Sequence, residues 1–315
     1  MSQPASTEAY KKEQTFTNYN KEQGEAYAQG RPGYHPTLYQ YIIDTHIATG
    51  GQLDTLLDVG SGPGTAVRAL GVNFSHAIGL DPSESMVATA RSLGGATSIA
   101  ESIRFEVSTA EDLGTSLPNR PIPNASVDLI TAANSAHWFN MSQFWTTAAR
   151  VLKPGGSVVM WMSGKTVMHP SVPSSAAIDA AMDDLEETHL RSYMVRGNFM
   201  TRNRYIDLPL PWTLDEPISG FDQSAFVRKE WDIAEDPFAC QPGASLDGFE
   251  KMFKTMSTVT RWYEAHPDAI GTEQDISKVY RRTIECLLHE AGVDKGKEML
   301  KGAMRGVTLT VKRSA

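Results

Sequence analysis

The residues best suited to chemistry follow a short apolar run with one acidic residue in it, residues 56–59. Three glycines stand at alternate positions after it, Gly60, Gly62 and Gly64. Glycine lets the backbone turn sharply and approach a ligand without a Cβ atom in the way. A helix starting near Thr65 would aim its N-terminal amides at whatever lies over these glycines. The nicotinamide fingerprint needs its third glycine at position 65, so the spacing argues against a dehydrogenase.

A second apolar run, residues 77–80, ends in a carboxylate, Asp81. A carboxylate at a strand's carboxyl end can accept hydrogen bonds from both hydroxyls of a ribose. The helix that follows Pro82 and Ser83 carries Met86, whose flexible thioether suits an adenine face. The structural alternative is that Asp81 caps this helix and Met86 packs in the core. Because Asp81 accompanies the glycine turn, binding of a ribose is favoured over capping of the helix.

Two further strands end in polar loops. Residues 103–107 alternate as a strand and lead to the polar turn 108–112, which suits the edge of an adenine. Residues 126–132 read as a buried strand that ends at the segment 133–139, and a break at residues 154–156 precedes another strand. Strands and helices alternate, which predicts an open α/β sheet with its ligand beyond the carboxyl ends of the strands.

Taken together, these motifs resemble a known series. Over roughly residues 15–165 the chain resembles class I S-adenosylmethionine (SAM)-dependent methyltransferases. The motifs that carry this resemblance are LDVGSGPGT, GLDPS, STAEDL, DLITAANSAHWF and LKPGG. AHWF and the upstream AYAQGRPGY resemble the trans-aconitate methyltransferase-like branch, and within it the chain is similar to fungal thiol methyltransferases that cap dithiols of toxins such as gliotoxin. The resemblance implies SAM as cofactor, S-adenosylhomocysteine as product, no metal, and a Rossmann-like seven-stranded sheet with helices on both faces and a helical cap insertion.

The same resemblance divides the chain into four parts. They are an N-terminal lid segment (1–40), a SAM-binding core (41–165), a cap that binds the substrate (166–265), and a C-terminal helix and strand that complete the sheet (266–315). We expect helices over 178–193, 246–265 and 276–290, and strands over 226–231 and 306–311. One face of the second helix is predicted to be packing core rather than pocket, with Phe249, Met252, Phe253, Met256 and Trp262.

The resemblance also implies which residues of this sequence hold the cofactor. Many relatives have an aspartate where Thr109 stands, so the contact to the adenine amino group would shift to a backbone carbonyl or to Glu111. Arg31 would pair with the methionine carboxylate, the alternative being a surface helix with a capping arginine. The implied contacts are Gly60, Ser61 and Gly62 at the methionine part, Asp81 at the ribose, Pro82, Met86, Thr109, Ala110 and Glu111 around the adenine, Asn134 and Ser135 beside the sulfonium, and Tyr19, Tyr27 and Arg31 in the closing segment.

Methyl transfer from a sulfonium is an in-line displacement, so the protein mainly positions the acceptor atom and excludes water. A thiol ionises near pH 8.5 and a carboxylate is already ionised, so neither needs a dedicated base, whereas an alcohol or amine does. His137, just past the fourth strand, is the candidate catalytic residue for such help. The alternative is that it only orients the neighbouring loop.

The choice of acceptor can be argued from charge. Trans-aconitate would need several convergent cations, for which Arg191, Arg196, Arg202 and Arg204 are available. A compact dithiol would want an aromatic pocket, and the aromatic residues near the lid favour it slightly. A SAM-binding regulatory protein without turnover is a further alternative, because a fold does not fix function. The residues predicted to bind a dithiol are Tyr10, Phe16, Trp138, Phe139, Phe199 and Trp212.

The composition of the chain argues against several other classes of protein function. The net charge of −8, from 29 Lys and Arg against 37 Asp and Glu, argues against a nucleic-acid partner. Two cysteines, Cys240 and Cys286, are too few for a disulfide framework and are predicted to be free, buried thiols. The polar N-terminus has no apolar export segment, and no run is long enough to span a membrane. We therefore expect a soluble, cytoplasmic protein with a single sheet and an added cap that acts on a small molecule, and the sequence leaves its oligomeric state open, with a monomer plausible.

Overall fold

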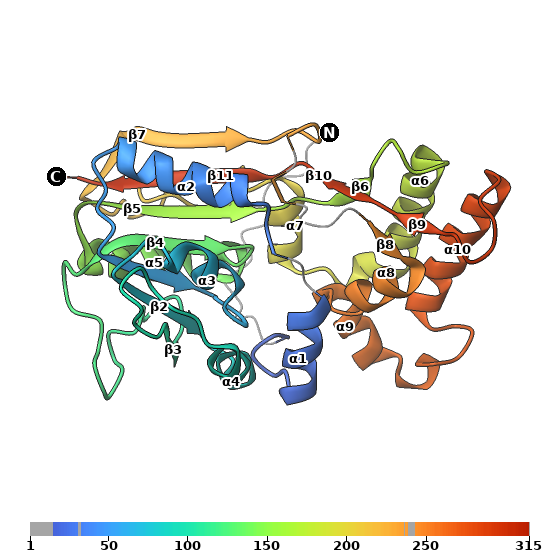
Figure 1. The fold of residues 1–315 in the computed structure, drawn as a ribbon, viewed down its shortest axis with the longest axis horizontal. Helices are drawn as coiled ribbons and strands as arrows, with labels where there is room; N and C mark the ends of the chain where they lie inside the picture. Colours follow the sequence, from blue (N-terminus) through green and yellow to red (C-terminus); the bar gives the residue numbers. More distant parts are fainter. Residues whose placement is uncertain (1–14, 31–32, 236, 239–242, 315) are drawn as a thin grey trace.

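A seven-stranded sheet with strand order β3-β2-β1-β4-β5-β11-β7 forms the centre of the molecule (Figure 1). The structure is a computed structural model that describes residues 15–30, 33–235, 237–238 and 243–314. Its first five strands run parallel, and β11 pairs antiparallel with both β5 and β7, which confirms the Rossmann-like sheet. The strands are β1 (Thr55–Val59), β2 (His76–Asp81), β3 (Arg104–Val107), β4 (Val127–Ala133), β5 (Leu152–Met162), β7 (Phe221–Glu230) and β11 (Val307–Arg313).

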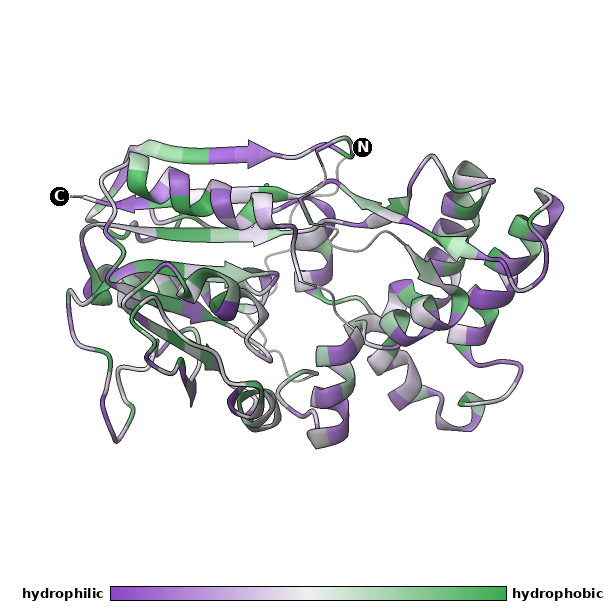
Figure 2. Cartoon of the chain, in the orientation of Figure 1, coloured by the Kyte–Doolittle hydropathy of each residue, from purple (hydrophilic) through white to green (hydrophobic). Residues whose placement is uncertain are grey.

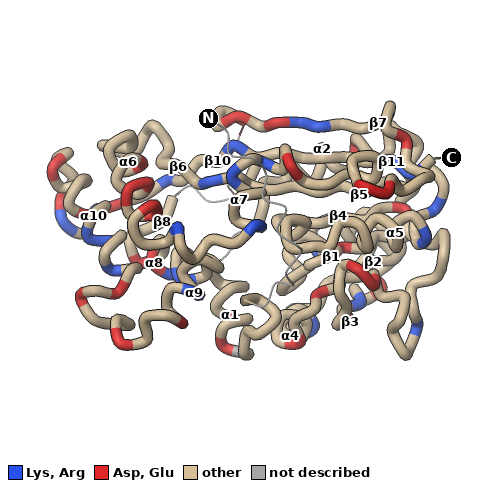
Figure 3. The backbone as a smooth tube through the Cα atoms, turned by 180° about the vertical axis from the view of Figure 1, so that it is seen from behind, with Lys and Arg blue, Asp and Glu red and all other residues tan. Residues whose placement is uncertain are grey.

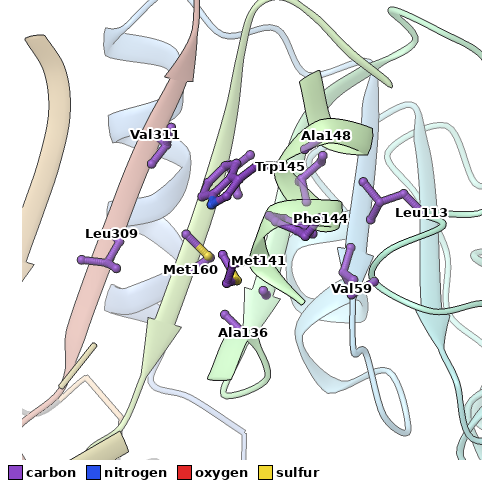
Figure 4. Close-up of a cluster of buried hydrophobic side chains, with 14 of the residues drawn as sticks. Val59, Leu113, Ala136, Met141, Phe144, Trp145, Ala148, Met160, Leu309 and Val311 are labelled. Atoms are coloured by element: carbon purple, nitrogen blue, oxygen red, sulfur yellow. The ribbon is translucent and has the colours of Figure 1, made fainter. Parts of the chain in front are cut away.

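Helices cover both faces of this sheet, as predicted. Neighbouring residues of one strand enter different cores, since Leu56 packs with one apolar cluster and Leu57 with the other. Figure 4 shows Trp145 of α5 beside Met160 of β5, with Phe144 on the side of Val59 and Leu113. The second face is covered by helices that follow β1 and β2 or precede β1. The covering helices are α2 (Pro36–Ala48), α3 (Thr65–Gly71), α4 (Glu84–Leu93) and α5 (Met141–Val151).

Strand order reverses at β1, whose two neighbours are β2 and β4. In open α/β sheets this is the point where the loops beyond the strand ends separate and leave a crevice for a ligand. The ends of β1, β2 and β4 carry Gly60, Asp81 and Asn134. The sheet topology therefore brings together three polar loops that are far apart in the sequence.

A second, mainly helical lobe forms the cap and has its own apolar core. Figure 1 shows it beside the sheet at the end where the carboxyl ends of the parallel strands lie. Figure 2 shows hydrophobic and hydrophilic residues alternating along its helices, as expected for helices with one buried side. Its elements are β6 (Thr166–Met168), α6 (Ser175–Leu185), β8 (Ala244–Ser245), α8 (Leu246–Phe253), α9 (Ser257–Ala265), α10 (Ile276–Glu290), β9 (Met299–Leu300) and β10 (Gly302–Met304). Helix α7 (Arg196–Arg202) lies against the sheet, where Met200 joins the core that α5 covers.

Several local expectations are corrected. The helix predicted over 246–265 is two helices, because the backbone of Met256 is extended and α9 begins after it. The helix predicted over 178–193 begins at Ser175 and leaves the α-helical geometry at Glu186, where a π-helical turn follows. Cys286 is exposed rather than buried, and Cys240 lies outside the described residues.

The packing of the cap also differs from a simple division by sequence. α10 contacts α6 and α8 and contributes to the core of the cap, while β11 alone of the C-terminal segment joins the sheet. The division at residues 165 and 265 thus remains a prediction about domains. Among the described residues, no helix combines the length and apolarity that crossing a membrane requires.

Candidate functional site

The glycine turn after β1 depends on its glycines for two reasons. Gly60, Gly62 and Gly64 have φ of 64°, 53° and 86°, a region that other residues rarely adopt. A Cβ atom on Gly60 would lie 2.6 Å from the Cβ of Ser135, so only glycine fits against the β4 loop. Around Gly62, by contrast, a Cβ atom would meet nothing within 4 Å. The turn therefore packs tightly on one side and leaves open space on the other.

Asp81 links this turn to the end of β2. One carboxylate oxygen accepts a hydrogen bond from the Gly62 amide at 2.8 Å, and the other accepts from the Ser83 amide at 2.9 Å. The N-cap of α4 is Ser83, whose hydroxyl accepts from the Met86 amide, so the capping interpretation of Asp81 is wrong. Two backbone amides thus hold a mostly buried carboxylate in a fixed orientation at the ends of β1 and β2.

A cavity of about 120 Å³ lies over these strand ends. It brings together most residues predicted to hold the cofactor, while Ser61 and Tyr19 do not line it and Arg31 lies outside the described residues. Thr17 and Ala133 also line it and were not predicted. The predicted residues in its lining are Tyr27, Gly60, Gly62, Asp81, Pro82, Met86, Thr109, Ala110, Glu111, Asn134 and Ser135.

Side-chain hydrogen bonds fix the far wall of this cavity. Asn134 adopts a left-handed backbone conformation, which asparagine tolerates better than most residues. Its amide nitrogen donates to the Tyr34 hydroxyl at 2.8 Å, and its amide oxygen accepts from the Ser163 amide at 2.9 Å. Ser135 donates to the Val59 carbonyl at 2.8 Å. The loop after β4 is therefore rigid and well tied to β1 and β5.

Aromatic side chains close the cavity. Phe16 from the N-terminal segment stands edge-on to Trp138, with ring centroids 6.1 Å apart, and to Tyr27 at 5.7 Å. Phe16, Trp138 and Phe139 line the cavity, and their binding of a dithiol acceptor stays a prediction. Tyr19 packs behind them, and its hydroxyl lies 3.3 Å from that of Thr260 in the cap. The N-terminal segment thus bridges the cavity and the cap.

The structure does not bring the other predicted side chains to this cavity. Tyr10 lies outside the described residues, and Phe199 is partly exposed beneath the guanidinium of Arg191. Trp212 packs on Phe226, on the face of the sheet that α5 covers. The physical reason for Trp212 is that α7 and the segment after it pack on the sheet instead of staying in the cap.

His137 faces the protein interior instead of the cavity. Its Nδ1 atom lies 2.8 Å from the hydroxyl of Tyr205, and it lines neither cavity described here. Burial lowers the pKa of His137 to about 3, so its ring is neutral and shares one hydrogen bond with the Tyr205 hydroxyl. The geometry matches the alternative in which His137 orients its loop, and it does not place a general base at the cavity.

A second, larger cavity of about 440 Å³ lies in the cap. Phe249, Met252, Phe253 and Met256 line it. Phe249, Phe253 and Trp262 are also buried in the core of the cap, with Met252 and Met256 packed against that core, so the predicted packing role is confirmed and four of the five side chains border a cavity as well. The feature of the sequence that could have indicated this cavity is the concentration of methionine over residues 166–304. Six of the chain's 13 methionines line this one cavity, Met168, Met182, Met194, Met252, Met256 and Met304.

The two cavities share a wall. Asn134 lines the first and Ser163 the second, and the two residues are hydrogen-bonded to each other. Helix α1 (Lys21–Gly30) contributes in the same way, with Tyr27 in the first lining and Gly30 in the second. One loop and one helix therefore separate the strand-end cavity from the cap cavity.

The four arginines proposed for a tricarboxylate do not converge. Arg202 lines the cap cavity and pairs with Glu186, whereas Arg191 pairs with Glu187 and Arg204 with Glu230. Arg196 lines neither cavity. Figure 3 shows Lys and Arg interspersed with Asp and Glu over both lobes. The charges thus form separate ion pairs and not one cationic pocket.

One group of side chains in the described part of the chain could hold a metal ion, Glu285, His289 and Glu298. The Glu298 carboxylate already accepts from His289 at 2.7 Å and from the Gly296 amide, and these hydrogen bonds lower its pKa to about 2. None of the three lines either cavity. A role for metal at the strand-end site is therefore not suggested by this group, and the expectation of a metal-free site stays a prediction.

Comparison with known proteins agrees with this geometry. Residues 57–160 match a family model described as a methyltransferase domain. A putative methyltransferase of Dictyostelium discoideum is 33% identical over 139 residues, which are 44% of this chain and 46% of that protein. A probable SAM-dependent methyltransferase of Saccharomyces cerevisiae is 29% identical over 147 residues, 47% of each chain. The chain thus spans about half the length of these curated relatives.

Among solved structures, a putative type II methyltransferase from Anaeromyxobacter dehalogenans has the same fold. The TM-score is 0.56 at 21% identity, over 90% of this chain and 97% of that one. Residues 57–160 cover β1 to most of β5 and include the glycine turn, Asp81 and Asn134. Most of the strand-end cavity is accordingly built by the part of the chain that matches the family model, and Phe16, Thr17 and Tyr27 join it from outside that part.

Proposed function

We propose that this chain is a SAM-dependent enzyme that transfers a methyl group to a small-molecule acceptor, most specifically a thiol or dithiol. The observation that supports it is the strand-end cavity, where the glycine turn, Asp81 and Asn134 meet at the switch point of the sheet. The resemblance in the motifs points to the same donor and to the thiol branch. The full activity is a proposal for the whole chain, because its relatives match over about half their length.

The residues present fit SAM by their chemistry. The open space at Gly62 admits a ligand close to the backbone, and the buried Ser61 hydroxyl beside it has no partner within the described residues. The Asp81 carboxylate faces the same cavity and would hold the ribose hydroxyls. Pro82 and the buried Met86 would flank the adenine, and Asn134 with Ser135 would lie beside the sulfonium.

When bound, SAM supplies a methyl group that an acceptor thiolate takes with its sulfur lone pair, while the bond to the donor sulfur breaks and leaves its electrons there as a thioether. The acceptor proton goes to solvent, since a thiol ionises near pH 8.5 without a strong base. Phe16, Tyr27 and Trp138 exclude water and present aromatic rings that favour a positive charge. His137 stands away from the cavity, which favours an acceptor that needs no base.

Charge also favours the thiol over the alternative acceptor. Trans-aconitate carries three carboxylates and would need several cations in one place. Arg202 alone of the four candidate arginines lines a cavity, and it is already paired with Glu186. Carboxyl methylation of trans-aconitate or a related acid is therefore the weaker proposal, and SAM binding without turnover is the alternative outcome of the tests.

Two measurements test the function. Calorimetry with SAM and S-adenosylhomocysteine should give saturable binding, and Asp81→Ala should weaken it roughly 10- to 100-fold, the value of charge-assisted hydrogen bonds. The matched control is Asp54→Ala at the opposite end of β1, where the carboxylate pairs with Lys153 on the surface. Unchanged affinity in Asp81→Ala would refute the cofactor site.

The second measurement is methyl transfer from labelled SAM to reduced gliotoxin and to trans-aconitate. We expect label on the dithiol and none on the acid. Methyl ester formed only on the acid would overturn the thiol proposal and leave the methyltransferase intact. SAM binding with no product from either compound or from a wider thiol panel would favour the regulatory alternative.

A further inference from the structure

The strand-end cavity is small for the donor proposed to bind there. Its volume is about 120 Å³, whereas proteins hold small molecules and cofactors in pockets of roughly 300–1,000 Å³. The loops after β1, β2 and β4 are tied together by hydrogen bonds and by the close contact of Gly60 with Ser135. Residues 15–19, which we call the cover segment, close another side of the cavity with Phe16 and Thr17. The cover segment is therefore the part that has to move when a ligand of this size enters or leaves.

Two adjacent residues of α9 in the cap hold the cover segment. Arg261 donates from Nη1 to the Thr15 hydroxyl at 2.9 Å. The Thr260 hydroxyl lies 3.3 Å from the Tyr19 hydroxyl. These two contacts flank Phe16 in the sequence, and Phe16 lines the cavity. Helix α9 therefore fastens the chain on both sides of an aromatic side chain that covers the strand-end site.

The guanidinium of Arg261 is fixed by further hydrogen bonds. Its Nε donates to the Tyr193 carbonyl at 2.7 Å, and its Nη2 donates to the side-chain oxygen of Asn198 at 2.7 Å. Asn198 is held in turn, because its amide nitrogen donates to the Ser257 hydroxyl at 3.1 Å. A planar guanidinium that is bound at Nε and Nη2 has its Nη1 donor aimed in one direction. Since Arg261 lines neither cavity, it acts on the strand-end site through Thr15.

Helix α7, which carries Asn198, also holds a second aromatic side chain of the cover. A Cβ atom on Gly197 would lie 2.5 Å from the ring of Trp138, so α7 packs directly on that ring. Trp138 and Phe16 both line the cavity and stand edge-on to each other. Removal of the Arg261 guanidinium would open the resulting circuit of contacts at its polar link. The circuit runs through Trp138, Phe16, Thr15, Arg261, Asn198 and Gly197.

We infer that Arg261 is a positioning residue that holds the cover segment over the strand-end cavity, so that its hydrogen bond to Thr15 sets the rate at which the donor enters and the product leaves. The inference rests on the proposed function for the identity of these ligands as SAM and S-adenosylhomocysteine. It gives α9 a part in the cofactor site, although α9 lies outside the residues 57–160 that match the family model. The cap thereby controls exchange at a site that the sheet builds.

The first test measures the exchange of S-adenosylhomocysteine. Dissociation of the labelled compound is followed after a chase with excess unlabelled compound, and association is followed by tryptophan fluorescence. Thr15→Val removes the acceptor hydroxyl with little change of shape. Because the cover must open for both entry and exit, we expect both rate constants to rise roughly 3- to 10-fold, the value of one hydrogen bond, while Kd changes less than about twofold. Arg261→Gln should have at least the same effect.

The matched control is Arg282→Gln, whose guanidinium pairs with Glu273 on the surface of the cap and which should exchange like the wild type. If Thr15 and Arg261 act through one hydrogen bond, the double variant should dissociate at the rate of Arg261→Gln and not at the product of the two effects. Unchanged dissociation in both single variants, independent effects in the double variant, or weaker binding through slower association would overturn the inference. Absence of binding to the wild type would refute the proposed function instead.

The second test needs no ligand. Amide hydrogen exchange of the cover segment should become roughly 3- to 10-fold faster in Arg261→Gln, while β1 keeps its protection, which shows that the variant folds. Arg282→Gln should leave both segments unchanged. Equal exchange of the cover segment in the wild type and Arg261→Gln would refute this inference whether or not SAM is the ligand, so its failure is distinct from the failure of the proposed function.

Discussion

The two cavities of this molecule are built in different ways. The strand-end cavity is formed by short loops after β1, β2 and β4, whose positions are set by backbone hydrogen bonds, positive φ angles and the Asp81 carboxylate. The cap cavity is formed by side chains from helices and short strands spread over residues 163–304, with methionine the most frequent apolar type. One is held by backbone geometry and the other by adaptable side chains.

The difference matches the two reactants of the proposed reaction, the methyl donor, which is always the same, and the acceptor, which varies between enzymes. A donor that never changes is best held by rigid groups that need no reordering on binding. An acceptor that differs between enzymes is best met by side chains that can repack, and methionine does this at low cost. We therefore expect the strand-end cavity to fail after small changes and the cap cavity to tolerate them.

The largest effect should come from Gly60→Ala. Its φ of 64° and the 2.6 Å approach to Ser135 leave no room for a methyl group, so the turn or the β4 loop must move. We expect SAM affinity to fall by about 100-fold or more, because both walls of the cavity shift together. Calorimetry with SAM measures this loss of affinity.

The matched control for Gly60 is Gly155→Ala. Gly155 also has a positive φ, 76°, but a Cβ atom there would meet nothing within 4 Å. It should lose about 1 kcal/mol of stability and keep its SAM affinity. If both variants lose SAM alike, backbone strain and not the contact with Ser135 governs the site.

The next effect concerns Asp58, buried beneath the glycine turn. Burial, with a smaller contribution from the charge of Asp81, raises its pKa to about 7, and Thr131 donates to one oxygen at 2.6 Å. Since the folded pKa exceeds the unfolded value near 4, stability should fall as pH rises from about 4 to 7 and then level off. Asp58→Asn should remove this slope and gain a few kcal/mol at pH 8, at roughly 1.4 kcal/mol per pKa unit.

Urea unfolding of wild type and Asp58→Asn at pH 5 and pH 8 measures this effect. An equal stability difference at both pH values would show that Asp58 is ionised throughout. The result matters for the comparison because a protonated Asp58 would make the strand-end site sensitive to pH.

The sequence predicted the strand-end cavity well because its determinants are local. Glycines, a strand-terminal carboxylate and Asn134 each stand in a short motif, and the parallel sheet brings strand ends together by topology. The cap cavity depends on how separate helices pack, and the apolar face of α8 has the same spacing whether it faces a core or a cavity. Trp212 was misplaced for a similar reason, because nothing local shows that the chain returns to the sheet after α7.

A smaller effect should follow from His137→Asn. The folded pKa of His137, about 3, lies below the unfolded value near 6.5, so stability should fall as pH drops through that range. An asparagine oxygen can accept from Tyr205 in place of Nδ1, so the variant should keep the hydrogen bond and lose the slope. Methyl transfer should change by less than about threefold, and a much larger loss would make His137 part of the reaction.

The smallest effect, and the sharpest test of the contrast between the cavities, should come from Met252→Leu with Met256→Leu. Swaps of similar volume usually cost under about 1.5 kcal/mol, and these side chains face a cavity and not a filled core. SAM affinity should be unchanged, while the range of accepted thiols should narrow because leucine adapts less than methionine. A panel of thiols of increasing size measures this range. If the double variant accepts the same panel with the same KM values, these methionines do not select the acceptor, and the adaptability attributed to the cap cavity has no part in specificity.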